Sequence, residues 1–120
     1  MLIYISGAIS GDPDYKRKFA DAEKVLTKKG HDVINPAFVA SVLPHLEHEQ
    51  YLHIDKALIG ISDAVYFLKD WGTSKGAREE YDAVKYHNEV AQGVKRLCDG
   101  KWISCDQIKL IFEGENEDEI

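Results

Sequence analysis

Cysteine is scarce in this sequence, and basic residues do not outnumber acidic ones. Only Cys98 and Cys105 are present among the 120 residues. Two cysteines cannot form a disulfide framework, and their spacing does not match a metal-binding pair, so we expect a reducing, cytoplasmic environment. The net charge of −6 argues against the basic surface that a nucleic-acid polymer requires. No apolar run approaches the roughly 20 residues that span a bilayer, which argues against a membrane partner.

Four sequence signatures of enzymes are also missing. Residues 48–53 hold one residue too many between their histidines for the zinc-binding pattern H-E-x-x-H. No G-x-S-x-G elbow marks a serine hydrolase. Residues 6–11 contain two glycines but match neither the dinucleotide-binding pattern G-x-G-x-x-G nor a Walker loop. We therefore expect no metal and no organic cofactor.

What the sequence does contain is an alternation of short apolar runs with amphipathic segments. The runs typical of buried strands are residues 2–5, 31–35, 64–68 and 108–112. Helical spacing of apolar residues separates them, over residues 13–29, 47–61 and 74–87. This order predicts an α/β fold, a Rossmann/flavodoxin-like three-layer sandwich with a central parallel sheet of about four to five strands. We expect one domain over residues 1–112 and an acidic, flexible tail over residues 113–120.

Local signals predict where the elements begin and end. Asp12 is predicted as the N-cap of the first helix, with Pro13 at its first position and Gly30 as its stop. Residues 94–97 and 102–104 are further strand candidates. The predicted apolar stripe of the second helix is Tyr51, Ile54, Leu58 and Ile61.

Two loops are expected to meet where such a sheet binds ligands. In open parallel sheets, ligands bind beyond the carboxyl ends of the strands, at the point where the strand order reverses. The loop after the first strand could present backbone N–H groups to a phosphate, although a tight connection between strand and helix is the alternative. The predicted substrate-binding residues of the two loops are Ser6, Gly7, Ala8, Ile9, Ser10, Gly11, Trp71, Ser74 and Gly76.

Two carboxylates are candidates for chemistry. Asp55 falls inside the apolar stripe of the second helix, where a carboxylate is costly unless it is paired or functional. The alternative is a structural acid that accepts backbone N–H bonds. Glu80 shares a helix face with Ala77 and Val84, in the first turns of the third helix, where the helix dipole keeps a carboxylate ionised. This position suits a nucleophile, although an acid that only stabilises the helix dipole is the alternative.

Three motifs follow one another along the chain: Ile3-Tyr4-Ile5-Ser6-Gly7 with Ile9 and Gly11, then Asp55 ahead of Ser62-Asp63-Ala64-Val65-Tyr66, then Ser74-x-Gly76-x-x-x-Glu80. In this order they resemble the motifs of nucleoside 2-deoxyribosyltransferases and of the similar 2′-deoxynucleoside 5′-phosphate N-hydrolases. The resemblance covers roughly residues 1–90. Residues 35–37 and 71–77 are also similar to a branch of this superfamily that is common in phage and prophage genomes.

The resemblance implies cleavage or transfer of the N-glycosidic bond of a (deoxy)nucleoside or nucleoside 5′-monophosphate. Glu80 would be the nucleophile that forms a covalent glycosyl intermediate, with Tyr4 holding it and Asp55 protonating or orienting the departing base. Ser74 matches the phosphate-preferring hydrolases, whereas Ser10 stands where they carry arginine, so the need for a phosphate stays open. Relatives imply a homodimer or larger homo-oligomer. The alternatives are a nucleotide sensor without catalysis and a plain interaction module.

Overall fold

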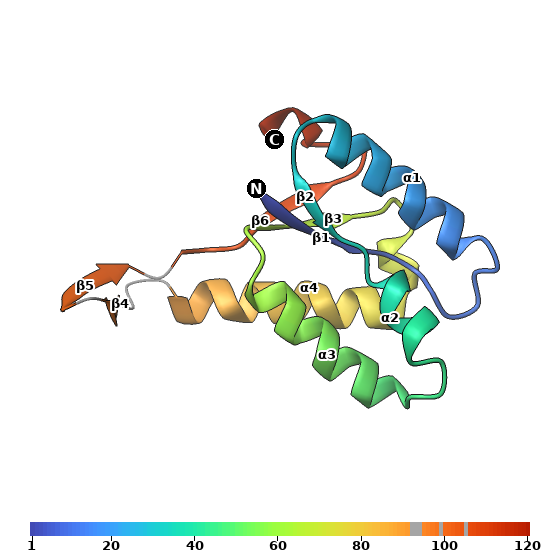
Figure 1. Ribbon diagram of the computed structural model, residues 1–120, viewed down its shortest axis with the longest axis horizontal. Helices are drawn as coiled ribbons and strands as arrows, with labels where there is room; N and C mark the ends of the chain where they lie inside the picture. The colour runs from blue at the N-terminus through green and yellow to red at the C-terminus, as the bar shows by residue number, and fades with distance from the viewer. Residues whose placement is uncertain (92–94, 99, 105) are drawn as a thin grey trace.

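A computed structural model of the chain describes residues 1–91, 95–98, 100–104 and 106–120. Four parallel strands form its central sheet in the order β2-β1-β3-β6. These strands are β1 (Leu2–Ser6), β2 (Asp32–Ile34), β3 (Ala64–Phe67) and β6 (Lys109–Phe112). Helix α1 (Tyr15–Lys28) covers one face, and α3 (His48–Gly60) and α4 (Lys75–Ala91) cover the other (Figure 1). The predicted α/β sandwich with a central parallel sheet is confirmed.

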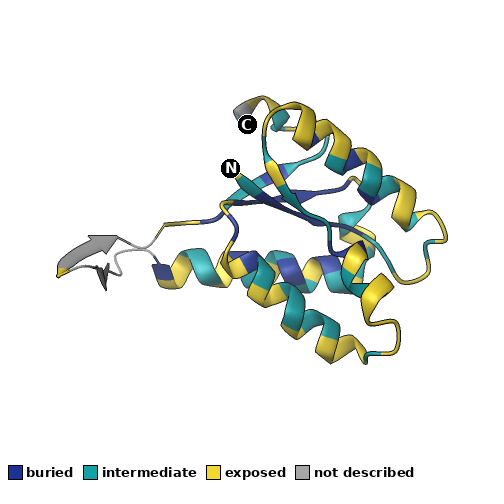
Figure 2. Cartoon of the chain, in the orientation of Figure 1, coloured by how far each residue is buried: buried dark blue, intermediate teal, exposed yellow. Residues whose placement is uncertain are grey.

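The alternation of side chains along β1 explains the two cores. Successive side chains of a strand point to opposite faces of the sheet. Ile3 and Ile5 accordingly pack with Phe19 of α1 in one core, whereas Tyr4 packs with Val84 of α4 in the other. Because both faces are covered, the strand reads as a nearly continuous apolar run. Figure 2 shows the resulting buried sheet between helices whose outer faces are exposed.

Two predictions at element ends were wrong. Helix α1 begins at Tyr15 with Asp14 at its N-cap, because the Asp12 side chain accepts the backbone N–H of Asp14 at 2.9 Å and so closes a turn ahead of the helix. Ile61 is 66% exposed and Ile59 takes the buried place, because α3 ends at Gly60 and helical spacing no longer applies beyond it.

Other ends follow the sequence. Gly30 terminates α1 with a φ of +91°, a conformation that glycine adopts without strain. Residues 36–46, between β2 and α3, contain a short helix, α2 (Ala37–Val42), and the 3₁₀ helix η1 (Trp71–Thr73) follows β3. Within the described ranges, every helix is too short or too polar to cross a bilayer.

The chain ends in two further features. The strand candidates 94–97 and 102–104 correspond to β4 (Lys95–Cys98) and β5 (Lys101–Ser104), an antiparallel pair separate from the main sheet; residue 94 lies outside the described residues. This pair projects past the end of α4 (Figure 1). The acidic segment 113–120 includes the 3₁₀ helix η2 (Glu117–Glu119), and the Tyr66 hydroxyl donates a hydrogen bond to Glu117. Its division from the domain stays a prediction.

Candidate active site

The strand order reverses between β1 and β3, and a cavity lies at that point. From β1 the chain crosses to β2 on one side and later to β3 on the other, and Ser6 pairs with Phe67 at the carboxyl end. The cavity measures about 410 Å³. Seven of the predicted site residues line it, namely Gly7, Ile9, Ser10, Asp55, Ser74, Gly76 and Glu80. The two loops therefore meet as predicted, at the place where open α/β sheets bind ligands.

The Glu80 carboxyl is fixed at both oxygens. Glu80 belongs to the buried stripe of α4 and is only 6% exposed. Ser6 Oγ donates a hydrogen bond to Glu80 Oε1 at 2.8 Å, and the Tyr4 hydroxyl donates to Oε2. Tyr4 and Ser6 can act together because residues two apart on a strand share a face. Strand β1 thus sets the position of a carboxyl group on α4.

Burial shifts the protonation of this group and of Asp55. Burial raises the pKa of Glu80 to about 8; the Tyr4 and Ser6 hydrogen bonds oppose this shift and the Asp55 charge adds to it. Burial also raises the pKa of Asp55 to about 6, with Tyr4 opposing. Because the two carboxyls interact, their protons leave in two successive steps. Between about pH 6 and pH 8 the pair therefore holds one proton and one negative charge.

Asp55 of α3 lines the cavity, and one of its carboxyl oxygens lacks a hydrogen-bond donor among the described residues. Its Oδ1 is buried and accepts no hydrogen bond from any residue that the structure describes. The structural acid considered from the sequence would have used such an oxygen to accept backbone N–H groups. An unpaired buried carboxyl oxygen is costly, so a donor on a bound ligand would stabilise it.

The loop after β1 lies close against Leu68, and one of its backbone N–H groups already donates a hydrogen bond to Asp70. A Cβ atom at Gly7 would lie 2.7 Å from Leu68 Cδ1, so the close approach of the two loops requires glycine there. The backbone N–H of Ala8 donates to Asp70 Oδ1 at 3.3 Å. Gly11 adopts a φ of +80° and does not line the cavity.

The start of α4 also contributes to the cavity. Ser74 Oγ accepts the backbone N–H of Ala77 at 3.2 Å, which makes it the cap of α4. A Cβ at Gly76 would lie 3.8 Å from both His48 Cε1 and Ser74 Oγ, which is an ordinary contact. The glycine therefore leaves a little extra room where α3 approaches the first turn of α4.

Trp71 is placed away from the cavity. Its ring packs 5.2 Å from Phe67 and 4.9 Å from Tyr81, measured between centroids, and 5.7 Å from Phe112. Phe112 comes from β6, a strand that is remote in the sequence. Aromatic rings stabilise one another in such clusters, so the Trp71 indole contributes to the second core.

Several cavity residues were not predicted as site residues. They come from α2 and its start, from α3, and from the start of α4 with the residue two before it: Pro36, Val39, Ala40, His48, Tyr51, Leu52, Thr73, Lys75 and Ala77. Tyr51 belonged to the predicted apolar stripe, which could have indicated that this face of α3 covers the cavity. Nothing in the short α2 segment indicated its role. Within the described ranges, no group of three or more potential ligands could hold a metal ion.

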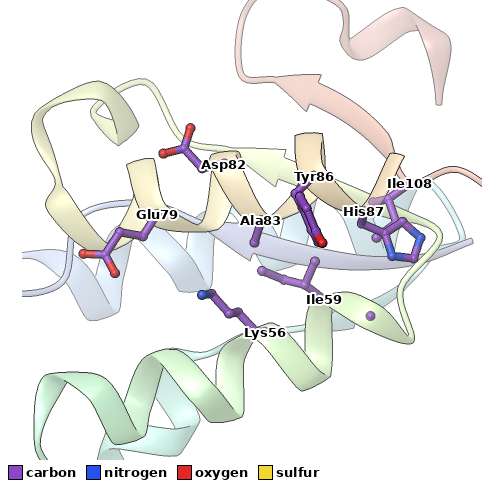
Figure 3. Close-up of a pocket in the computed structure, with 9 residues that line it drawn as sticks. Lys56, Ile59, Glu79, Asp82, Ala83, Tyr86, His87 and Ile108 are labelled. Atoms are coloured by element: carbon purple, nitrogen blue, oxygen red, sulfur yellow. The ribbon is translucent and has the colours of Figure 1, made fainter. Parts of the chain in front are cut away.

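A second, more open hollow lies between α3 and α4 (Figure 3). Lys56 and Ile59 contribute to it from α3, and Tyr86 and His87 from α4. Neither Asp55 nor Glu80 lines it.

Known proteins match this chain at two levels. The family described as "Domain of unknown function (DUF4406)" matches residues 1–91. The solved structure of a 2-deoxyribosyltransferase from the psychrotolerant bacterium Bacillus psychrosaccharolyticus is similar, with 20% sequence identity and a TM-score of 0.54, over 72% of this chain and 67% of that chain. No curated protein matches. The resemblance to deoxyribosyltransferases is thus confirmed in the fold, whereas the phage branch and the oligomer stay predictions.

Proposed function

The chain belongs to the DUF4406 family, and on that premise we propose that it cleaves the N-glycosidic bond of a (deoxy)nucleoside or nucleoside 5′-monophosphate. The sugar would pass to water or to a second base. One observation carries the proposal: Glu80, held by Tyr4 and Ser6, lies with Asp55 in the cavity at the strand switch. The shared fold with a 2-deoxyribosyltransferase supports it.

The first step forms a covalent bond between sugar and enzyme. A Glu80 oxygen attacks C1′, and the bond from C1′ to the base nitrogen breaks with its electron pair moving to the base. Asp55 donates its proton to the departing base. A carboxylate nucleophile paired with a carboxylic acid parallels the retaining glycosidases. Because the pKa of Glu80 is the higher of the two, the single proton that the pair holds between about pH 6 and pH 8 rests mainly on Glu80 in the free protein, and it must move to Asp55 before Glu80 attacks.

The second step releases the sugar. Water or another base attacks C1′ and the bond to Glu80 breaks, which restores the carboxylate. Asp55 accepts the proton that the attacking group loses. The Tyr4 and Ser6 hydrogen bonds stabilise the carboxylate both as nucleophile and as leaving group.

The cavity walls suggest where the parts of the substrate lie. Val39, Tyr51 and Leu52 are among the residues that line the cavity, and their apolar side chains suit the faces of a base. Ser10 and Ser74 also line the cavity, and their hydroxyl groups suit the sugar.

The test is incubation with common 2′-deoxynucleosides and their 5′-monophosphates, with and without a second free base. Chromatography would measure the released or exchanged base. We expect Glu80→Ala to lower turnover at least about a thousandfold. Glu89→Gln, an exposed acid on the same helix, is the control and should keep wild-type turnover.

The outcomes separate the alternatives. Base release that depends on Glu80 supports hydrolysis, and exchange supports transfer. Binding without any base release would contradict the enzyme and favour the sensor. Unchanged turnover in Glu80→Ala would exclude this mechanism.

A further inference from the structure

The proposed function leaves open whether the substrate is an uncharged nucleoside or its 5′-monophosphate. Two acidic residues near the cavity, Asp70 and Glu79, help to decide between them. A phosphate monoester carries a charge of about −1.5 to −2 near neutral pH. Its binding needs N–H groups or cations that are free to face it. Carboxylates of this chain already hold two such positions, one at the loop after β1 and one at the start of α4.

At the loop after β1, the resident anion is Asp70. Its Oδ1 accepts the Ala8 N–H, the kind of backbone group that cradles phosphate in other α/β proteins. Its Oδ2 lies 3.2 Å from Lys18 Nζ, and Lys18 also pairs with Asp12 at 2.7 Å. These hydrogen bonds raise the pKa of Lys18. One cation between two carboxylates leaves this corner with a net negative charge.

At the start of α4, the resident anion is Glu79. One of its oxygens, Oε1, lies 3.3 Å from His48 Nε2 and 4.0 Å from Lys75 Nζ. His48, which is charged only when protonated, and Lys75 are also the basic residues among those that line the cavity. A phosphate placed against them would have to compete with Glu79.

The two carboxyl groups that line the cavity add further negative charge. Asp55 and Glu80 together hold one negative charge between about pH 6 and pH 8. Asp70 and Glu79 do not line the cavity themselves, but they bind the Ala8 N–H and the lining residues His48 and Lys75. A phosphate in the cavity would therefore lie near like charges, which is costly across a binding surface. A 5′-hydroxyl avoids this cost. The Ser74 hydroxyl, whose oxygen caps the helix, keeps its own hydrogen for a donor bond to it.

We propose that Asp70 and Glu79 are specificity-determining residues that exclude the 5′-phosphate, so that the substrate is an uncharged nucleoside. The inference rests on the proposed function for the site. In this inference the site distinguishes the two substrates by repelling the monophosphate. Specificity can arise in this way as well as from better contacts with the correct substrate.

The test is calorimetric titration of the whole protein with a 2′-deoxynucleoside and with its 5′-monophosphate, at low salt and about pH 8. We expect the nucleoside to bind at least about tenfold more tightly, and the difference to shrink as salt screens the charges. Glu79→Gln and Asp70→Asn keep the side-chain shape and remove one charge each. Both should narrow the ratio of the two dissociation constants. Glu89→Gln, ten positions further along α4 than Glu79, should leave it unchanged.

Each result decides something. If the monophosphate binds as tightly as the nucleoside or more tightly, the inference is wrong. If the protein also releases the base from that monophosphate, the proposed function still stands. A nucleoside preference that neither variant narrows overturns the assignment to Asp70 and Glu79. Failure of both compounds to bind, together with no base release, overturns the proposed function and the inference with it. Thermal unfolding of each variant would show that the fold is retained.

Discussion

The Tyr4 hydroxyl of β1 donates a hydrogen bond to Glu80 Oε2 of α4, across 76 positions of sequence. Tyr4 is fully buried and Glu80 is 6% exposed where it lines the cavity, so this bond forms in a region that is largely shielded from water. A hydrogen bond in such a region is electrostatically stronger than in water, and its loss leaves a buried oxygen unpaired. The relationship links the strand that begins the fold to the proposed nucleophile.

Removal of the Tyr4 hydroxyl tests this link. In Tyr4→Phe the bond that lowers the pKa of Glu80 is lost, so we expect the pH optimum of turnover to move upward and the rate at neutral pH to fall. The free energy of unfolding should fall by about 1–3 kcal/mol, since one buried oxygen loses its donor. Urea unfolding and a pH series of kcat/KM measure both effects. An unchanged pH optimum would contradict the positioning role.

The dependence of kcat/KM on pH follows from the carboxyl pair. The mechanism needs one proton and one negative charge on Asp55 and Glu80. We expect a bell-shaped profile with limbs near about pH 6 and about pH 8. This profile should be measured with an uncharged nucleoside as the assay substrate, because the phosphate of a monophosphate would itself titrate in the same pH range. A profile that stays flat from about pH 5 to about pH 9 would be inconsistent with this pair.

Stability should depend on pH through Glu80. Its pKa in the folded protein is raised from 4.5 to about 8, so the folded state holds this proton more tightly than the unfolded state does. The contribution is present below about pH 4.5 and is lost as pH rises towards 8. Glu80→Gln carries no ionisable group and should lack this loss, which we expect to reach a few kcal/mol. The measurement is urea unfolding of both proteins at about pH 5 and about pH 9; parallel behaviour would refute the shift.

Two glycine substitutions should have opposite effects on stability. Gly7→Ala places a Cβ against buried Leu68, 2.7 Å from its Cδ1, and we expect a loss of about 1–3 kcal/mol. Gly60→Ala is the matched control, because a Cβ there meets no atom within 4 Å in the described part of the chain. Since Gly60 is the last residue of α3, alanine should stabilise the protein by up to about 1 kcal/mol. Thermal unfolding distinguishes the two, and a stable Gly7→Ala would show that the loops can separate.

The order of strands and helices and the buried face of α4 could be predicted from the sequence. Periodicity reports which face of an element avoids water, and capping and turn residues report where the element stops. The sequence accordingly predicts Glu80 in the first turns of α4, on the same face as the buried Ala77 and Val84. The same reasoning failed at Asp12 and Ile61, where a local side-chain bond and an early helix end changed the boundary.

The contacts between elements were decided by the tertiary structure. Periodicity shows that a face is covered, but it does not show which remote segment covers it. The sequence therefore did not place Trp71 against Phe112, Asp70 on the Ala8 N–H, or His48 beside Glu79. Each contact depends on how α2, α3, α4 and β6 pack around β1 and β3. The sequence could identify Asp55 and Glu80 individually as candidate carboxylates. Only the folded chain brings them to one cavity, where they share a proton.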